Sequence, residues 1–96
     1  MISRDDFVFT IGYDGATAIV DGKAKKENAR LSTMELAEKG LYRAAFSSAL
    51  YSGNQDELKA FFGYFNGKAG TKYTEASQFC RLFGVNQENV SKVLVL

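Results

Sequence analysis

The sequence contains no histidine, no proline and a single cysteine, Cys80, among its 96 residues. Without histidine the chain lacks the commonest metal ligand and general base, and this inventory excludes zinc sites and His-dependent catalytic triads. A single cysteine cannot form a disulfide within the chain. Because no histidine can activate it and its neighbours are apolar, Cys80 is interpreted as a small core residue. The absence of proline means that no helix or strand is broken by that residue.

The chain has almost no net charge and no extended apolar segment. Twelve basic and eleven acidic residues leave a net charge of +1. Nucleic-acid-binding proteins usually carry excess positive charge, so this balance counts against DNA binding and leaves only a local basic patch open. No apolar run approaches the length of a membrane span, and the N-terminus lacks a signal-peptide pattern. We therefore expect a cytoplasmic protein with no membrane partner.

The length and composition predict one domain over residues 1–96. A hydrophobic content of 46% and a charged content of 24% are those of an ordinary globular protein. A chain of this length can bury one modest core but not two. The patterns along the chain predict an α+β fold, in which a β-hairpin over about residues 6–21 packs on three to four α-helices. A C-terminal third strand is left open as an alternative.

Alternating apolar residues near the N-terminus predict the hairpin. Asp14 and Gly15 offer the two positive-φ positions of a tight two-residue turn. The predicted register pairs Tyr13 with Ala16, Ile11 with Ala18 and Phe9 with Val20. All six side chains then fall on one apolar face. An isolated two-stranded hairpin is only marginally stable in water, so helices, a third strand or a second subunit must cover it.

Residues 22–30 are the most basic stretch of the chain and contain a single acid, Glu27. The four cations of this stretch are Lys23, Lys25, Lys26 and Arg30. Short charge runs of this kind are usually solvated loops, and we favour that interpretation. The alternative is a basic arm that contacts phosphates beside a DNA-reading helix.

Two helices are predicted in the middle of the chain. Ser32 and Glu35 form a capping box at the start of the first, which we expect to run to about Tyr51. Residues 41–50 are apolar or small on nearly every side, which predicts a central buried helix. The second helix spans residues 55–66, and its stripe of leucine and phenylalanine is interpreted as core.

The last two dozen residues contain the pattern that offers a function. Thr74 can cap a helix over residues 75–83, and Gly84 is then the expected left-handed residue at its end. Val85 is placed to fold back onto that helix, and Asn86 can cap a further one. Two helices joined by so short a turn must cross steeply, as in a helix-turn-helix.

The stretch from Gly84 to Leu94 resembles the turn and recognition helix of the lac repressor family of bacterial repressors. The resemblance does not extend to the rest of the chain, and Cys80 stands where such proteins normally have alanine. It implies a double-stranded DNA partner and a three-helix unit whose first member is the helix over residues 55–66. The outward residues that it places at the DNA are Asn86, Gln87, Glu88, Ser91 and Lys92, and Asn86, Gln87, Ser91 and Lys92 are the candidate contacts. Lys72, in a mildly basic loop, joins this candidate set.

The tail from Lys92 to Leu96 supports a second interpretation. Its apolar, β-branched run is equally typical of a short strand that pairs with the hairpin and covers its open edge. In that case Gly84 merely ends a helix, and no recognition helix follows.

We therefore expect a small non-enzymatic DNA-binding or regulatory protein, dimeric because one short helix rarely binds DNA tightly alone. The alternative is a protein–protein interaction module, which binds a protein partner or a second copy and whose C-terminus is a structural strand or packed helix. No catalytic residue, metal site or cofactor is expected, since the glycine pattern matches neither a P-loop nor a dinucleotide fingerprint. The paired carboxylates stand at the starts of elements, where helix capping explains them.

Overall fold

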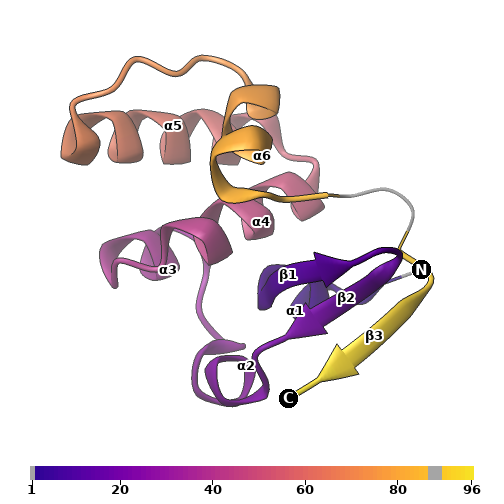
Figure 1. Cartoon of the computed structure of the whole chain (residues 1–96). Helices are drawn as coiled ribbons and strands as arrows, with labels where there is room; N and C mark the ends of the chain where they lie inside the picture. The colour runs from indigo at the N-terminus through magenta and orange to yellow at the C-terminus, as the bar shows by residue number, and fades with distance from the viewer. Residues whose placement is uncertain (1, 87–89) are drawn as a thin grey trace.

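The computed structural model describes residues 2–86 and 90–96, and it places a small sheet beside a layer of helices (Figure 1). The helices are α1 (Arg4–Val8), α2 (Gly22–Asn28), α3 (Thr33–Glu38), α4 (Tyr42–Ser52), α5 (Gln55–Ala69) and α6 (Ala76–Phe83). The strands are β1 (Thr10–Asp14), β2 (Thr17–Val20) and β3 (Lys92–Val95). The predicted α+β class is confirmed.

Residues 4–8 form helix α1, and the prediction that the first strand starts in this region is wrong. The Ser3 hydroxyl accepts a hydrogen bond from the Asp6 N–H at 3.2 Å and so caps the helix. The side chains of Phe7 and Val8 in this helix are both buried in the core. The helix packs against α4 and β2.

β1 and β2 form the predicted hairpin in a different register. The observed pairs are Thr10 with Val20, Gly12 with Ile19, Tyr13 with Ala18 and Asp14 with Thr17. The turn therefore falls at Gly15 and Ala16, and the predicted register is wrong. Gly15 has a φ of +59°, a conformation that costs glycine little. The register shifts at a bulge between Thr10 and Gly12, and the side chain of Ile11 is 55% exposed.

Residues 22–28 form helix α2, so the prediction of a solvated loop is wrong here. The Asp21 carboxylate accepts a hydrogen bond from the Ala24 N–H at 3.0 Å and caps the helix. Lys25 and Lys26 lie in its last turn, where the helix dipole favours cations. The segment carries no apolar stripe, and hydrophobic periodicity therefore does not reveal it.

Gly40 divides the predicted helix over residues 33–51 into α3 and α4. Its φ of +84° is left-handed and ends α3. The capping box of Ser32 and Glu35 is confirmed at the start of α3. The Ser32 N–H donates to the Glu35 carboxylate at 3.0 Å, and this bond lowers the pKa of that carboxyl from its usual value. α4 is the central helix, as predicted, and it contacts α1, α3, α5 and α6.

The end of α6 follows the prediction, and its beginning differs by one residue. Glu75, not Thr74, is the N-cap residue and forms a capping box with Gln78. Gly84 has the expected left-handed φ of +66°. The Val85 N–H folds back to donate to the carbonyl oxygen of Cys80 at 2.9 Å.

Aromatic rings hold the helical layer together. Phe46 of α4, Phe61 and Phe65 of α5 and Phe79 of α6 pack in one cluster. The ring of Phe79 has no exposed surface, and its centroid lies 5.4 Å from those of Phe46 and Phe61. The stripe of α5 is therefore core, as predicted, although the helix continues past residue 66.

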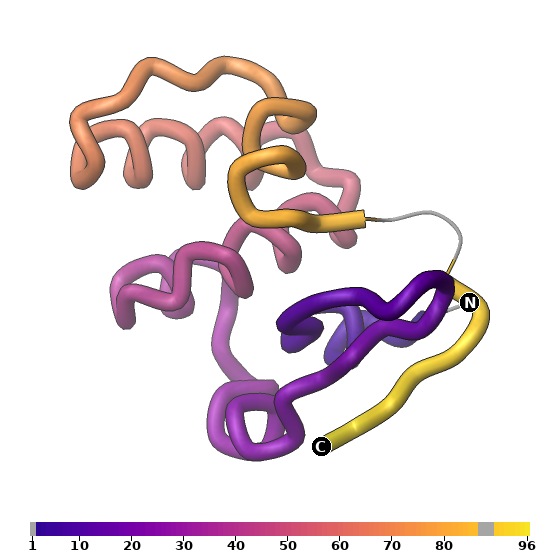
Figure 2. The backbone as a smooth tube through the Cα atoms, viewed as in Figure 1, coloured from indigo at the N-terminus to yellow at the C-terminus, as the bar shows by residue number. Residues whose placement is uncertain are grey.

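The tail of the chain forms the third strand. β3 pairs in parallel with β2, with Val93 opposite Ala18 and Val95 opposite Val20. In Figure 2 it lies beside the hairpin from the start of the chain. The further helix after Asn86 is therefore a wrong prediction for residues 90–96, and the strand interpretation is confirmed. Valine at alternate positions suits a strand, and β2 offers it an open edge.

Two glycine substitutions test this account of the helix boundaries. A Cβ on Gly63, inside α5, meets nothing within 4 Å, so Gly63→Ala should raise the free energy of unfolding by about 1 kcal/mol. Gly40→Ala also meets nothing within 4 Å but must hold a φ of +84°, and it should lower that free energy by about 1–2 kcal/mol. Urea denaturation measures both changes. Equal effects at the two sites would show that the left-handed turn at Gly40 is not required.

Candidate functional site

The residues that the repressor resemblance assigns to DNA do not lie together on a helix. Asn86 follows α6, and the Tyr13 hydroxyl donates to its carbonyl oxygen at 2.9 Å. Ser91 precedes β3, and its N–H donates to the Ala16 carbonyl oxygen at 2.8 Å. Lys92 is the exposed first residue of β3. Gln87 and Glu88 lie outside the described residues.

The predicted basic side chains are spread over the molecule. Lys72 lies in the loop between α5 and α6, at the far end of the molecule from α2 (Figure 1). The predicted basic arm consists of Lys23, Lys25 and Lys26 on α2 and the exposed Arg30 after it. The Lys25 Nζ lies 2.7 Å from the Asp6 carboxylate, and this hydrogen bond raises the pKa of Lys25. These cations therefore do not form one surface with Lys72.

β3 is an edge strand with one open side. The Lys92 N–H donates to the Ala16 oxygen at 3.3 Å, and the Leu96 N–H donates to the Val20 oxygen at 2.9 Å. Backbone groups alternate in direction along a strand, so those of Val93 and Val95 face away from β2. Within residues 2–86 and 90–96, no strand pairs with that side.

The faces of β3 are open as well. Val93 is 39% exposed, while Leu94 and Val95 are each 50% exposed. Paired residues share a face of the sheet, so Val93 and Val95 lie on the same face as Ala18 and Val20. Ala18 and Val20 are fully buried. The helical layer thus covers β2 and stops short of β3.

The opposite edge of the sheet, at β1, is protected. The bulge between Thr10 and Gly12 interrupts its ladder. Asp14 places a charge at its end, and the Tyr13 side chain is bonded to the backbone of Asn86. Bulges and charges are common devices against unwanted strand pairing. On β3 the single charged residue is Lys92.

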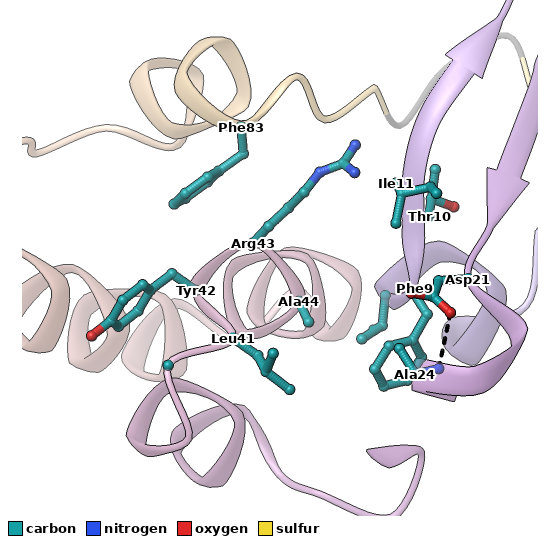
Figure 3. A pocket seen from close by; sticks show the side chains of 12 residues that line it. Phe9, Thr10, Ile11, Asp21, Ala24, Leu41, Tyr42, Arg43, Ala44 and Phe83 are labelled. Carbon is teal, nitrogen blue, oxygen red and sulfur yellow. Dashed lines mark hydrogen bonds between the residues drawn. The ribbon is translucent and has the colours of Figure 1, made fainter. Parts of the chain in front are cut away.

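A pocket of about 410 Å³ lies between α4, β1 and the end of α6 (Figure 3). Its lining is mainly apolar and includes Val8, Phe9, Ile11, Ala24, Leu41, Tyr42, Ala44 and Phe83. Arg43 and Asp21 are its charged lining residues. The Arg43 Nη2 donates to the Gly84 carbonyl oxygen at 3.2 Å, whereas its buried Nε has no acceptor in the part of the chain that is described. Burial lowers the pKa of the Arg43 guanidinium.

Sequence reasoning misses Arg43, although the sequence holds a signal for it. Arg43 is the one charged residue in the stretch 41–50, which is otherwise apolar, small or aromatic. A long cation inside such a stretch must extend its stem along apolar surface to reach a polar partner. Which surface it reaches depends on how α4 packs against β1 and α6.

Further features of the described part of the chain concern metal-ligand clusters, the Cys80 thiol and the helices. The described residues contain no group of three or more Cys, Asp or Glu side chains that could hold a metal ion. Burial raises the pKa of the Cys80 thiol, which lowers its reactive thiolate fraction at neutral pH. Among the helices described, none has both the length and the apolar character needed to cross a membrane.

Comparison of the chain with known protein families, curated proteins and solved structures gives no match. The resemblance to bacterial repressors, and DNA binding with it, therefore stays a prediction. The geometry instead brings forward two features, the open edge of β3 and the pocket around Arg43.

A pair of arginine substitutions tests whether Arg43 has a structural role. Arg4 donates four hydrogen bonds, to Asp5, Ala29, Leu31 and Ser48, so Arg4→Met should lower the free energy of unfolding by about 2 kcal/mol or more. Arg43→Met loses one bond and removes a half-buried charge, so it should change that free energy by less than about 1 kcal/mol. Urea denaturation compares the two variants. A loss at Arg43 as large as at Arg4 would mark Arg43 as a structural residue.

Proposed function

We propose that this protein is a non-enzymatic protein–protein interaction module whose partner is a second copy, joined edge to edge through β3. The observation that supports the proposal is the β3 edge, which is unpaired on one side and exposed on both faces in the part of the chain that is described. Open strand edges pair readily with other strands, so soluble proteins usually either block them or use them. The chain blocks β1 and leaves β3 open.

Two copies of β3 can pair antiparallel about a two-fold axis at Leu94. Val93 of one copy then lies opposite the partner's Val95, and their outward backbone groups form the hydrogen bonds. Lys92 lies opposite the partner's Leu96, so no like charges face each other. The apolar side chains of the strand meet apolar side chains on both faces. This contact is self-complementary, as a two-fold dimer requires.

The association should stop at two copies. A second open edge would let each dimer recruit further copies into a filament. β1 offers no such edge, because the bulge between Thr10 and Gly12 interrupts its ladder. A closed dimer with one continuous sheet is therefore the expected assembly.

The dimer should be weak. Stable interfaces bury about 800 Å² per partner, and pairing of such short strands buries less. We expect a dissociation constant on the order of 10 μM. A net charge of +1 adds little repulsion between copies.

Lysine substitutions at two equally exposed leucines test the proposed interface. Leu94→Lys places two like charges side by side at the two-fold axis and should weaken dimerisation at least about tenfold. Leu82→Lys makes the same change on α6, where the leucine is 48% exposed against 50% for Leu94, and should leave dimerisation unchanged. Sedimentation equilibrium from about 1 μM to 1 mM, a range that brackets the expected constant, measures each affinity. A wild-type protein that stays monomeric over this range contradicts the proposal, as does equal weakening by both variants.

Amide hydrogen exchange gives a residue-level test of the same dimer. The N–H groups of Leu94 and Leu96 face β2, so their protection should not change with protein concentration. Those of Val93 and Val95 face outward and should become protected only as the dimer forms. If a dimer forms and these two amides still exchange rapidly, the copies associate through another surface.

A further inference from the structure

We propose that the pocket between α4, β1 and α6 binds a small organic carboxylate with an apolar body, and that Arg43 anchors the carboxylate group. Figure 3 shows the Arg43 side chain extending from α4 into the space between Phe83 and Ile11. The pocket volume of about 410 Å³ falls in the range typical of small-molecule sites. This site is separate from the proposed dimer edge. The pocket adjoins β1, whereas the dimer edge is β3, and β2 lies between these two strands.

Arg43 has more hydrogen-bond donors than the described residues satisfy. A guanidinium has five N–H donors, and the described residues supply one acceptor, the Gly84 carbonyl oxygen. The Nε is buried and unpaired within those residues. The ion pairs in the described part of the chain join Arg4 to Asp5 and Lys25 to Asp6, so none involves Arg43. A half-buried cation is costly where the described residues supply no counter-charge, and a bound anion would offset that cost.

The charge balance of the lining selects a monoanion. Arg43 is the one basic residue among the lining residues, so a doubly charged phosphate would lack a second cation. The acidic lining residue, Asp21, is bonded to the Ala24 N–H at 3.0 Å. Figure 3 places Asp21 beside α2 and apart from the Arg43 guanidinium. A planar carboxylate also matches the guanidinium fork better than a neutral amide does.

The apolar lining selects the body of the ligand. Phe9, Ile11, Leu41, Ala44 and Phe83 offer aliphatic and aromatic surface and no further unpaired charge. A short aliphatic or aryl-alkyl chain would cover this surface while its carboxylate reaches Arg43. 3-Phenylpropionate has this shape and serves as the probe.

The test compares 3-phenylpropionate with 3-phenylpropanamide, its uncharged counterpart, by NMR titration of the labelled full chain. We expect saturable shifts at Ile11, Leu41 and Ala44, with a dissociation constant for the acid on the order of 1 mM. The amide should bind at least about tenfold more weakly. Equal affinity for acid and amide overturns the proposal, and so does the absence of saturable shifts at these residues.

Substitutions of Arg43 test whether this residue anchors the carboxylate or whether the ligand is held only by the apolar walls of the pocket. Arg43→Met should remove the preference for the acid, and Arg43→Gln should do the same if the methionine variant does not fold. Arg81→Met, an exposed arginine on α6, serves as the matched control and should keep the preference. Leu94→Lys should also keep it, so failure of the dimer and failure of this site are distinguishable. A preference for the acid that survives the loss of Arg43 assigns the carboxylate to another group and overturns the proposal.

Discussion

The parallel pairing of β2 with β3 is the interaction on which the sheet depends. β2 is the central strand of the sheet, and its Ala18 and Val20 side chains are fully buried. Its N–H and C=O groups need partners on both sides, because a buried strand cannot bond to water. β1 satisfies one side and β3 the other. The same pairing moves the open edge of the sheet outward to β3, where the helical layer no longer covers it.

The pocket depends on two local irregularities. At Gly40 the left-handed turn ends α3 and starts α4 in a new direction, which places Arg43 in the first turn of α4. On β1 the bulge lies at Ile11, whose side chain lines the pocket and is more than half exposed. The pocket lies between these two segments. Arg43 lies there with its stem on apolar surface and its charge without a carboxylate partner among the described residues.

The two proposed surfaces lie on opposite sides of β2 and differ in chemistry. The β3 edge is apolar, carries one charge and presents backbone groups, so it suits another strand. The pocket near β1 has mainly apolar walls, one cation, Arg43, and one acid, Asp21, that caps α2, so we propose it for a small amphipathic anion. The two surfaces consist of different residues, so the proposed dimerisation and the proposed ligand binding are independent of each other.

Local residue spacing is sufficient to predict several features of this fold. The Ser32 and Glu35 capping box, the left-handed Gly84 with the returning Val85, and the aromatic face of α5 all appear where local spacing puts them. In each case the interacting groups are a few residues apart, so their geometry follows from the chain itself.

The hairpin register, the strand formed by the tail and the position of Arg43 depend instead on packing between segments that are distant in the sequence. The tail carries a pattern that suits both a helix and a strand. The choice came from the hairpin, where the Ala16 oxygen of the turn and the Val20 oxygen of β2 accept N–H groups of the tail. Tyr13 fixes the entry to that segment through a bond to Asn86, 73 residues away along the chain. Contacts over such separations leave no local periodicity, because their energy exists only once the helices and the hairpin have packed.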